Sequence, residues 1–376
     1  MKINGIYLHN FRNYPQCSLQ FPSMVNIFYG KNAQGKTNLL EAVFYAAFGM
    51  SHRTSQEDDL FGEGRRELAV KVDFTSFDAD YDIKIKRYEQ HGRIKKELLL
   101  DNVNIKAKEH YGTLNTVMFS PEDLQLIKGE PQLRRRFFDM QIAQTDKTYY
   151  ELLVKYNRLL LQRNKLLKII RDEGNGKEQL ALWDKELACS AALIIRKRLE
   201  ALKKLLDIAS GIYASIAGSG EELDIKYGLK SSNDFILEQE NKTDAEWKVF
   251  YLQELKARQA LDILRGNTSI GPHRDDLFFY VSGRLLKAFG SQGQQRSAAL
   301  ALKLAQLEYV KIAVGEYPVL LLDDVMSELD SERRTHLLKF IDGRVQTFIT
   351  VNDKHLIPDL NNNAYFYIEN GKVTQG

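Results

Sequence analysis

Cysteine is scarce in this 376-residue chain, and several other features that mark particular classes of protein are missing. The two cysteines, Cys17 and Cys189, lie far apart without metal-ligand spacing, so neither a disulfide framework nor a cysteine metal site is expected. Residues 1–11 lack the apolar core of a signal peptide, and no apolar run approaches the roughly 20 residues that span a bilayer. These absences predict a cytoplasmic protein without a membrane segment.

The charge balance is also uninformative about partners. The formal net charge is only +3, so a nucleic-acid site must be sought in local clusters of basic residues. The chain has no internal repeat and no low-complexity tract. Its length suffices for two domains, or for one domain with a large insertion.

One octapeptide stands out among the residues that are present. It is Gly30-Lys31-Asn32-Ala33-Gln34-Gly35-Lys36-Thr37, which fits the phosphate-loop pattern GxxxxGK[ST]. Residues 24–29 are typical of a short buried strand, and residues 38–44 of the start of a helix. In that setting the glycines let backbone N–H groups point at a phosphate, while Lys36 reaches the β- and γ-phosphates and Thr37 ligates Mg²⁺. The pattern predicts a nucleoside triphosphate site, with a chance glycine-rich loop as the alternative.

Two carboxylates supply a candidate second half of this site. Residues 318–324 form an apolar run that ends in Asp323 and Asp324. At the carboxyl edge of a parallel sheet, Asp323 would lie beside the phosphate loop and hold Mg²⁺ through water. Asp324 would then orient or deprotonate the attacking water. Taken alone, the run is explained equally well by a buried strand capped by two solvated acids.

A third stretch, SQGQQR at residues 291–296, opens a long predicted helix. A Ser/Gly/Gln turn at a helix N-terminus is another anion site. Because the chain already has a complete phosphate loop, a second γ-phosphate binder would be most useful in trans, on a partner molecule. An ordinary helix cap followed by a polar turn is the alternative.

The remaining pattern predicts a split nucleotide-binding domain. Period-2 alternation at residues 68–74 and 81–85 indicates an antiparallel sheet beside the site. Helical periodicity at 152–170 and 187–206, broken at 171–176, indicates a helical hairpin too short to be an extended coiled-coil arm. We therefore expect an ATPase domain formed by residues 1–110 and 266–376, with a mainly helical insertion at 111–265.

Basic residues gather on the two helices of the predicted hairpin. Such strips bind phosphates in a sequence-independent, salt-sensitive way, although a solvated helix face is the alternative. No base-reading motif is visible, which agrees with recognition of DNA structure. The candidate DNA contacts are Lys155, Arg158, Arg163, Lys165, Lys168, Arg196, Lys197 and Arg198. Residues 134–136, three consecutive arginines, could instead contact the nucleotide or another subunit.

The order of these motifs, the helical insertion and the DDxxSELD run at 323–330 resemble the ABC-type ATPases of the structural-maintenance-of-chromosomes (SMC) and Rad50 kind. The match is closer still to one bacterial group, the RecF family of DNA repair proteins. The stretches that carry it span the chain: LHNFRNY at 8–14, the phosphate loop with 38–42, FSPEDL at 119–124, GPHRDD at 271–276, SQGQQR at 291–296, and residues 321–330.

This resemblance implies an α/β fold, namely an ABC-type ATPase head with a mixed sheet, flanking helices and an antiparallel β subdomain, plus a mainly helical second domain. Gly30–Thr37 would be Walker A, Asp323 the Walker B magnesium residue, and Asp324 the catalytic carboxylate, where ABC enzymes generally have Glu. The signature loop that meets the partner's γ-phosphate would be formed by Ser291, Gln292 and Gly293, continuing through Gln294, Gln295 and Arg296. Ser327 and Asp330 would belong to the D-loop across a dimer.

Two departures from the ABC pattern bear on the rate of hydrolysis. Val351-Asn352-Asp353 stands where a switch histidine would follow the strand at 347–350. Residues 119–123 contain no Q-loop glutamine. Both losses favour a slow ATPase that acts as a timer.

The resemblance implies a protein of recombinational repair that uses ATP and Mg²⁺. Two molecules would close around two ATPs, hold duplex DNA near a single-strand gap, and work with RecO and RecR to load RecA before slow, DNA-stimulated hydrolysis releases them. One alternative is the ATPase subunit of a membrane transporter, which should carry a switch histidine, a Q-loop and a shorter insertion. Another is a chromosome-organising protein, which would need long heptad arms.

Overall fold

The computed structural model describes residues 1–218, 220–231, 235–237, 242–357 and 363–375. The chain forms two compact units, each with its own core. Unit 1 comprises Met1–Leu124 and Leu302–Gly376, and unit 2 comprises Gln125–Ala301. The second division falls within one long helix, α10 (Gln292–Val314), which therefore contributes to both units. Among the described residues, no helix is long and apolar enough to cross a membrane.

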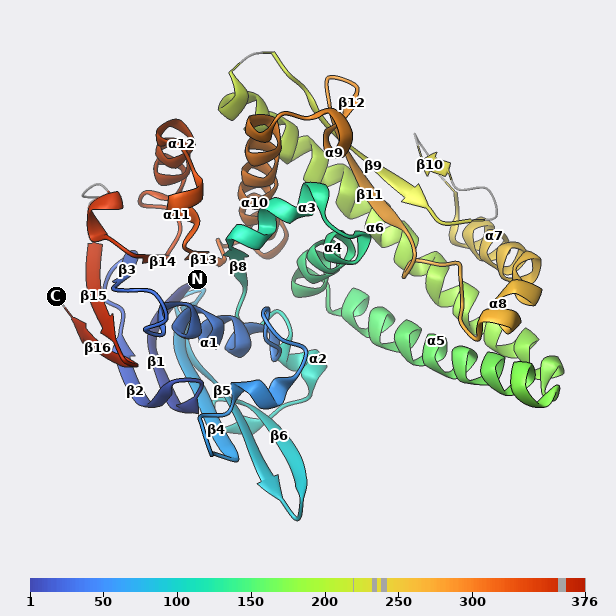
Figure 1. The fold of residues 1–376 in the computed structure, drawn as a ribbon, viewed down its shortest axis with the longest axis horizontal. Coiled ribbons are helices and arrows are strands. Elements are labelled where there is room, and N and C mark those ends of the chain that lie inside the picture. The colour runs from blue at the N-terminus through green and yellow to red at the C-terminus, as the bar shows by residue number, and fades with distance from the viewer. Residues whose placement is uncertain (219, 232–234, 238–241, 358–362, 376) are drawn as a thin grey trace. The chain divides into compact units, whose positions relative to one another are not determined.

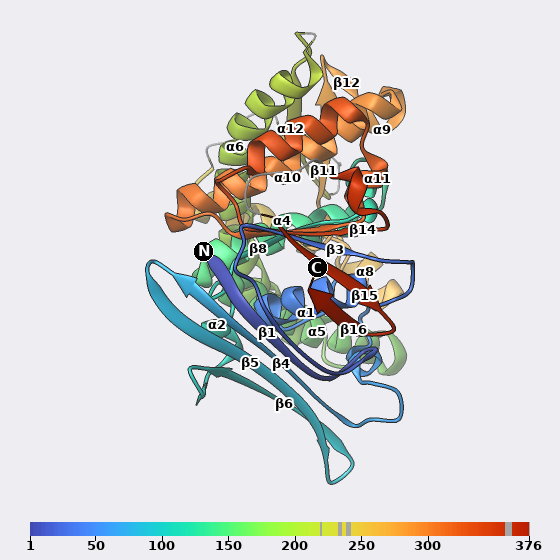
Figure 2. The ribbon, with the colours of Figure 1, turned by 90° about the vertical axis from the view of Figure 1, so that its left-hand side faces the viewer.

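Unit 1 contains an antiparallel sheet with strand order β2-β1-β4-β5-β6-β7. Figure 2 shows β1, β4, β5 and β6 side by side in this sheet. Alternate residues point into the core, since Val70 and Val72 pair with Ile85 and Ile83 and all four are buried. The alternation at 68–74 and 81–85 thus marks the two strands that it predicts. The strands are β1 (Lys2–Phe11), β2 (Tyr14–Gln20), β4 (Glu67–Ser76), β5 (Ala79–Gln90), β6 (Arg93–Leu100) and β7 (Val103–Asn104).

The second sheet of unit 1 is mostly parallel, with order β16-β15-β3-β14-β13-β8. In its register Val351 pairs with Tyr29 and Thr350 pairs with Asp323, so the carboxyl ends of β3, β14 and β13 meet at one edge. Strands β3, β13 and β14 are almost entirely buried, as expected when both faces of a sheet are covered. They are β3 (Val25–Tyr29), β8 (Thr116–Phe119), β13 (Val319–Asp323), β14 (Thr347–Val351), β15 (Asn363–Glu369) and the antiparallel edge strand β16 (Lys372–Gln375).

Helix α1 (Lys36–Phe48) contacts strands of both sheets, and nearly all of its residues are buried (Figure 1). Because α1 begins directly after the predicted phosphate loop, the core of unit 1 fixes the position of that loop. The other helices of unit 1 are α2 (Ala107–His110), α11 (Val325–Glu328) and α12 (Ser331–Ile341), with short 3₁₀ turns at Glu57–Leu60, Pro121–Leu124 and Lys354–Leu356.

Unit 2 combines helices with a four-stranded sheet. Helices α5 and α6 pack along each other, and Gly174, in a left-handed conformation, ends α5 within the break expected at 171–176 (Figure 1). The helices are α3 (Gln125–Lys128), α4 (Pro131–Thr145), α5 (Lys147–Glu173), α6 (Leu180–Ala217), α7 (Asp244–Ala257), α8 (Gln259–Arg265) and α9 (Leu286–Phe289), with a 3₁₀ turn at Lys177–Gln179. The strands, in sheet order, are β10 (Phe235–Leu237), β9 (Leu223–Leu229), β11 (Asp276–Val281) and β12 (Arg284–Leu285).

The sheet of unit 2 moves the domain boundaries away from those expected. Strand β11 pairs antiparallel with β9 from residue 276 to 281, so residues 266–301 pack in unit 2, whereas the sequence places them with the ATPase domain. Residues 111–124 likewise belong to unit 1, because β8 pairs in parallel with β13.

Three residues of the GPHRDD run at 271–276, namely Gly271, Pro272 and Asp275, are buried in unit 2, whereas Arg274 is exposed. The fully buried Asp275 accepts hydrogen bonds from the Tyr227 hydroxyl (2.9 Å) and from the Lys230 amide (3.0 Å). The buried Arg198 donates to the main-chain oxygen of Pro272 (2.7 Å). Gly271 has φ +125°, and a Cβ there would lie 2.4 Å from the Tyr156 hydroxyl, so only glycine fits. The run thus helps to hold α6 and β9 of unit 2 together.

Candidate functional site

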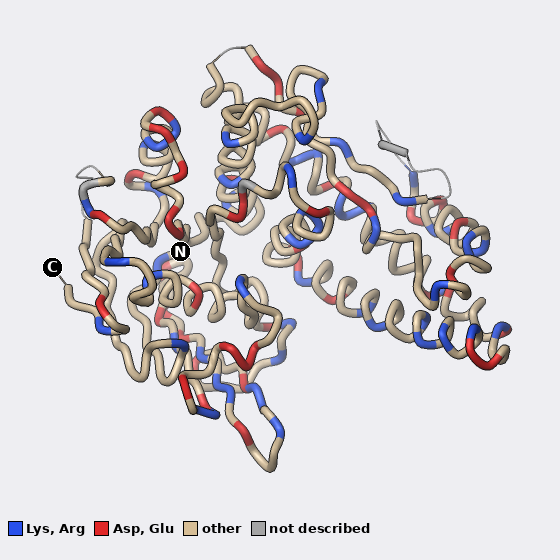
Figure 3. Tube along the Cα trace, in the orientation of Figure 1, with Lys and Arg blue, Asp and Glu red and all other residues tan. Residues whose placement is uncertain are grey.

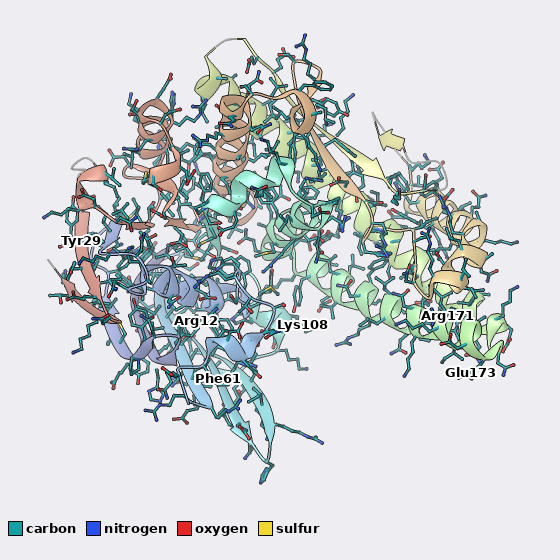
Figure 4. The ribbon with its side chains drawn as sticks, in the orientation of Figure 1. Arg12, Tyr29, Phe61, Lys108, Arg171 and Glu173 are labelled. Carbon is teal, nitrogen blue, oxygen red and sulfur yellow. The ribbon has the colours of Figure 1, made fainter. Side chains whose placement is uncertain are left out.

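The predicted phosphate loop connects β3 to α1 and depends on two glycines. Gly30 follows Tyr29, which is marked in Figure 4, and has φ +146°; a Cβ at Gly30 would lie 2.4 Å from the main-chain oxygen of Ile368. Gly35 has φ +114° and caps α1, and a Cβ there would lie 2.6 Å from Asn13 Nδ2. Both positions therefore require glycine, for conformation and for space.

Two turns of unit 1 hold the loop in place. The main-chain oxygen of Gln34 accepts hydrogen bonds from Asn13 Nδ2 (3.0 Å), in the β1–β2 turn, and from the Gly371 amide (3.1 Å), in the β15–β16 turn. The amide of Asn370 donates to Gln34 Oε1 (2.7 Å), and the Tyr14 hydroxyl donates to the oxygen of Gly35 (3.0 Å). These contacts shape the loop before any ligand arrives, which reduces the ordering cost of binding.

Lys36 lies buried at the start of α1. Its Nζ donates to the main-chain oxygens of Gly30 (2.6 Å) and Lys31 (2.8 Å) and to Asn352 Oδ1 (3.0 Å). Burial lowers the pKa of Lys36, while the charges of Asp324 and Asp323 oppose that shift. The ammonium is thus held at the loop, where phosphate oxygens could replace its present acceptors.

Asp323 joins the loop to the edge of the parallel sheet. Its Oδ1 accepts hydrogen bonds from the hydroxyls of Thr37 (2.8 Å) and Thr350 (2.7 Å). Burial raises the pKa of Asp323, whereas these two hydrogen bonds act to lower it. A carboxylate and a hydroxyl are the hard oxygen ligands that Mg²⁺ prefers, so Asp323 and Thr37 fit the ion. The structure therefore brings together the two residues expected to hold Mg²⁺.

Asp324 has a left-handed backbone, with φ +53°, at the point where β13 ends. Its amide donates to Thr350 Oγ1 (2.9 Å), and the Ser327 hydroxyl donates to its main-chain oxygen (2.7 Å). Asp330 accepts from the Arg333 amide (2.9 Å) and so caps α12. Within one molecule, both expected D-loop residues thus have local structural contacts.

The SQGQQR stretch forms the capped start of α10. Ser291 Oγ accepts from the Gln294 amide (3.1 Å), Gln294 Oε1 accepts from the Ser291 amide (2.9 Å), and Gln294 Nε2 donates to Glu221 Oε1 (2.8 Å). Gln295 Nε2 donates to the main-chain oxygens of Leu286 (3.0 Å) and Gly290 (2.9 Å). Ser291 and Gln292 are exposed, while Gly293 and Arg296 are half-buried. The helix cap considered as the alternative is therefore present, and it leaves the first two residues accessible.

Known proteins identify the family. The chain matches, over residues 2–375, the family model described as RecF/RecN/SMC N terminal domain. It is 41% identical over 351 residues to the DNA replication and repair protein RecF of Natranaerobius thermophilus, covering 93% of this chain and 91% of that protein. It is 40% identical over 377 residues to that of Alkaliphilus oremlandii, covering 99% and 100% respectively. The chain belongs to the RecF family.

Solved structures agree with this assignment. Two structures of the recombination mediator protein RecF in the RecFOR pathway, with ATPrS and with ATP, each have a TM-score of 0.90 and are 35% and 37% identical to this RecF-family chain. They cover 99% and 100% of this chain, which covers 97% of each of them. An SMC head bound to the C-winged helix domain of ScpA shares the fold, with a TM-score of 0.56 at 14% sequence identity. It covers 100% of this chain, and this chain covers 98% of it. The expected family and the α/β, SMC-head-like fold are confirmed.

For two of the eight candidate DNA contacts the prediction is wrong, because their side chains are buried. Arg163 is fully buried and pairs with Asp184 (2.6 Å) and Asp262 (2.8 Å). Arg198 is 3% exposed and pairs with Asp139 (2.9 Å). Arg163 lies seven residues from both Tyr156 and Ile170, and Arg198 lies seven residues from Ala191 and four from Leu202, all of them buried. The helical spacing therefore places both arginines on the buried side of their helices, a signal that the sequence analysis overlooked.

The other six candidates lie at or near the surface of unit 2. Four of them, Lys155, Arg158, Lys165 and Lys168, are exposed on α5, along which Figure 3 shows a series of basic residues. Arg196 and Lys197 on α6 are half-buried and paired, Arg196 with Glu200 and Asp244 and Lys197 with Asp146.

The sequence left open the role of three consecutive arginines, and two of them make contacts within unit 2. Arg134 makes two hydrogen bonds to Asp276 (2.7 and 2.8 Å), and Arg135 donates to the main-chain oxygen of Asp275 (2.6 Å). These two residues thus help to hold α4 against the GPHRDD run.

Sequence reasoning overlooked a charged cluster beside α1. Glu41, fully buried on α1, accepts two hydrogen bonds from Arg12 (2.9 and 2.7 Å), a residue marked in Figure 4, and one from Ser51. Burial alone would raise the pKa of Glu41, but hydrogen bonds from Arg12 and Ser51 hold it below its usual value. Arg53 also reaches Glu41 (3.3 Å) and Asn38 Oδ1 (2.8 Å). A glutamate within an otherwise apolar helix, LLEAVF at 39–44, was the available signal.

Proposed function

We propose that this RecF-family chain is an ATP-dependent DNA-binding protein of recombinational repair and replication restart, with weak, DNA-stimulated ATPase activity. Two copies dimerise on ATP, bind duplex DNA near a single-strand gap, and help RecO and RecR to load RecA, after which slow hydrolysis resets them. The observation that carries the proposal is the meeting of Lys36, Thr37 and Asp323 at one edge of the parallel sheet. The two similar RecF structures, described with ATP and ATPrS in the RecFOR pathway, support it.

Each loop residue has a role in this proposal. Lys36 exchanges its present acceptors for oxygens of the β- and γ-phosphates. Thr37 and Asp323 hold Mg²⁺, which would neutralise charge that develops on those oxygens. Asp324 lies one residue beyond Asp323 and orients or deprotonates the attacking water. The loop glycines, Gly30 and Gly35, keep the backbone close to the phosphates.

The remaining residues complete the site from a second molecule. Ser291 and Gln292, the exposed first residues of the SQGQQR stretch, face the γ-phosphate bound by the partner copy. A helix N-terminus with a serine hydroxyl suits this anion. Ser327 and Asp330 then form D-loop contacts across the dimer, exchanging their present local partners for new ones.

Oligomeric state, measured by light scattering with ATP and with ADP, tests this arrangement. Wild type should become a dimer with ATP and stay a monomer with ADP, and Lys36→Ala should stay monomeric with both. Lys339→Ala, which removes an exposed lysine on α12, is the matched control and should behave as wild type. A wild-type protein that stays monomeric with ATP, even with DNA present, would contradict the dimer.

Two further measurements separate the parts of the proposal. Asp324→Asn should retain the ATP-dependent dimer and lose hydrolysis, because it keeps the shape of the side chain but not its basicity. Binding to gapped DNA should weaken as salt is raised. A transporter subunit would show no such DNA binding.

A further inference from the structure

Lys36 is held by three acceptors, one of which lies outside the phosphate loop. Two are the main-chain oxygens of Gly30 and Lys31, at 2.6 and 2.8 Å, and the third is Asn352 Oδ1, at 3.0 Å. An ammonium group has three N–H donors and no acceptor, so these contacts use its full capacity. Any phosphate oxygen that Lys36 binds must therefore displace one of them.

The register of the parallel sheet places Asn352 beside the loop. Val351, the last residue of β14, pairs with Tyr29, the last residue of β3, so Asn352 follows its strand just as Gly30 follows β3. Asn352 is exposed, and among the described residues Lys36 is its one hydrogen-bond partner. Since this contact is the longest of the three and comes from an exposed side chain, it is the one that a ligand displaces most easily.

The chemistry of the amide makes this exchange specific. Lys36 can only donate, so the Asn352 atom that faces it must be the oxygen. A γ-phosphate oxygen that drew Lys36 away would then face that same Oδ1, and two acceptors repel. Rotation of the terminal amide brings Nδ2, a donor, to the phosphate instead.

We propose that Asn352 distinguishes a bound nucleoside triphosphate from a diphosphate. Without a γ-phosphate, Oδ1 accepts from Lys36 as observed. With a γ-phosphate, Lys36 turns to the nucleotide and Nδ2 donates to a γ-phosphate oxygen. This inference rests on the proposed ATP site and deepens it, because it names the residue that reports which nucleotide is bound.

A carboxylate at this position cannot make the exchange. Asn352→Asp keeps the size of the side chain and an acceptor for Lys36, but it has no donor for a phosphate. It also adds a negative charge beside the position of the γ-phosphate, at an edge that already holds Asp323 and Asp324. Asn352→Ala removes donor and acceptor together.

The test compares the affinities of ATPγS and ADP, measured by isothermal titration calorimetry at fixed Mg²⁺ and salt. Asn352→Asp should weaken ATPγS binding by about tenfold or more and change ADP binding by less than about twofold, since a hydrogen bond to a charged group is lost for one nucleotide only. Asn352→Ala should weaken ATPγS by about three- to tenfold, again with ADP little changed. Asn102→Asp, the same change at an exposed turn between β6 and β7, should alter neither affinity.

The outcomes separate this inference from the proposed function. If both Asn352 variants bind ATPγS as wild type does, or lose ATPγS and ADP affinity by the same factor, then Asn352 does not sense the γ-phosphate. The ATP site itself would stand in that case, because wild type would still bind and Lys36→Ala would not. If wild type binds neither nucleotide, both the proposed function and this inference fail.

Discussion

In unit 1 the charged groups of the candidate site lie at the edge of a sheet, whereas in unit 2 the strongest charge pairs lie in the interior and neutralise one another. Lys36 is held at the edge by neutral oxygens, and Asp323 by two hydroxyls. Arg163 and Arg198, by contrast, each meet carboxylates inside unit 2. Charges held by neutral groups remain available for a ligand of opposite sign. Charges held by each other fix one packing arrangement and leave nothing for a ligand.

The largest effect should follow from breaking a buried pair in unit 2. Arg198→Met removes the cation and leaves Asp139 and the fully buried Asp275 without it, which should destabilise unit 2 by about 3–5 kcal/mol. Both tryptophans of the chain, Trp183 and Trp247, belong to unit 2, so urea unfolding followed by their fluorescence measures this loss. ATPγS affinity should stay within about twofold of wild type, because the loop is built in unit 1.

The control for this variant is Arg158→Met, which makes the same substitution at an exposed position of α5. It should change the free energy of unfolding by less than about 0.5 kcal/mol. If Arg198→Met unfolds no more easily than Arg158→Met, then the buried pairs do not hold unit 2 together, and the contrast between the units fails.

A smaller loss, confined to unit 1, should follow from Gly30→Ala. The added Cβ would lie 2.4 Å from the main-chain oxygen of Ile368 at a φ of +146°, so the loop must shift, at a cost of about 2–3 kcal/mol. The shift should also abolish detectable ATPγS binding, which calorimetry checks. Gly92→Ala is the matched control: its φ is +71°, nothing lies within 4 Å of an added Cβ, and a cost of only about 1 kcal/mol is expected. Equal effects of the two variants would show that strain at any left-handed glycine, and not loop geometry, is responsible.

The two units also differ in how far the sequence predicts them. In unit 1 the phosphate loop and the strand that ends at Asp323 are fixed by local patterns, and the parallel register then brings Thr37 and Asp323 together. Thr350 and Asn352 lack such a pattern, because they act only through their place beside β13 and β3. A single residue that follows a strand has no signature until the strand order is known.

In unit 2 the helices follow from periodicity, but the pairing of β9 with β11 does not. The partner of strand β9 is β11, which lies about fifty residues further along the chain, with two helices in between. The acids that pair with Arg163 and Arg198 could not be predicted either, because Asp184, Asp262 and Asp139 come from other elements. Long-range pairing decides both features, and local sequence does not report it.

Lowering the pH should destabilise the two units to different extents, by a smaller amount than the substitutions above. Burial lowers the pKa of His110 in unit 1 to about 4 and that of His273 in unit 2 to about 3. A histidine that titrates near 6.5 when unfolded stabilises the fold fully above that pH, and this contribution is lost as the pH falls towards the folded value. Burial raises the pKa of Asp275 to about 7 from 3.8, so its contribution grows as the pH falls through that window. Asp275 therefore offsets His273 in unit 2. In unit 1 burial also raises the pKa of Asp323, but Asp323 contacts Thr37 at the start of α1, whereas His110 lies against Gly49 at the end of that helix.

Lowering the pH from 7 to 5 should thus weaken the His110 region by on the order of 1–2 kcal/mol and unit 2 by less. Hydrogen exchange at both pH values, corrected for the intrinsic rate, measures the two units separately. His110→Gln should remove most of the loss in unit 1, and Asp275→Asn should make unit 2 acid-sensitive. An unchanged pH response in His110→Gln would mean that another group controls unit 1.

The smallest effects should come from the exposed basic face of α5. Its basic residues face solvent, unlike the buried arginines of unit 2. Lys165 and Lys168 are exposed there, whereas Arg196 on α6 is already paired with Glu200 and Asp244. The double variant Lys165→Gln/Lys168→Gln should weaken binding to gapped duplex DNA by about three- to tenfold and reduce the salt slope by about two. Arg196→Gln should change the affinity and the salt slope much less, because two carboxylates already neutralise the charge of Arg196. Filter binding over a series of salt concentrations measures affinity and slope together. If the double variant keeps the wild-type slope, Lys165 and Lys168 do not contact the DNA backbone.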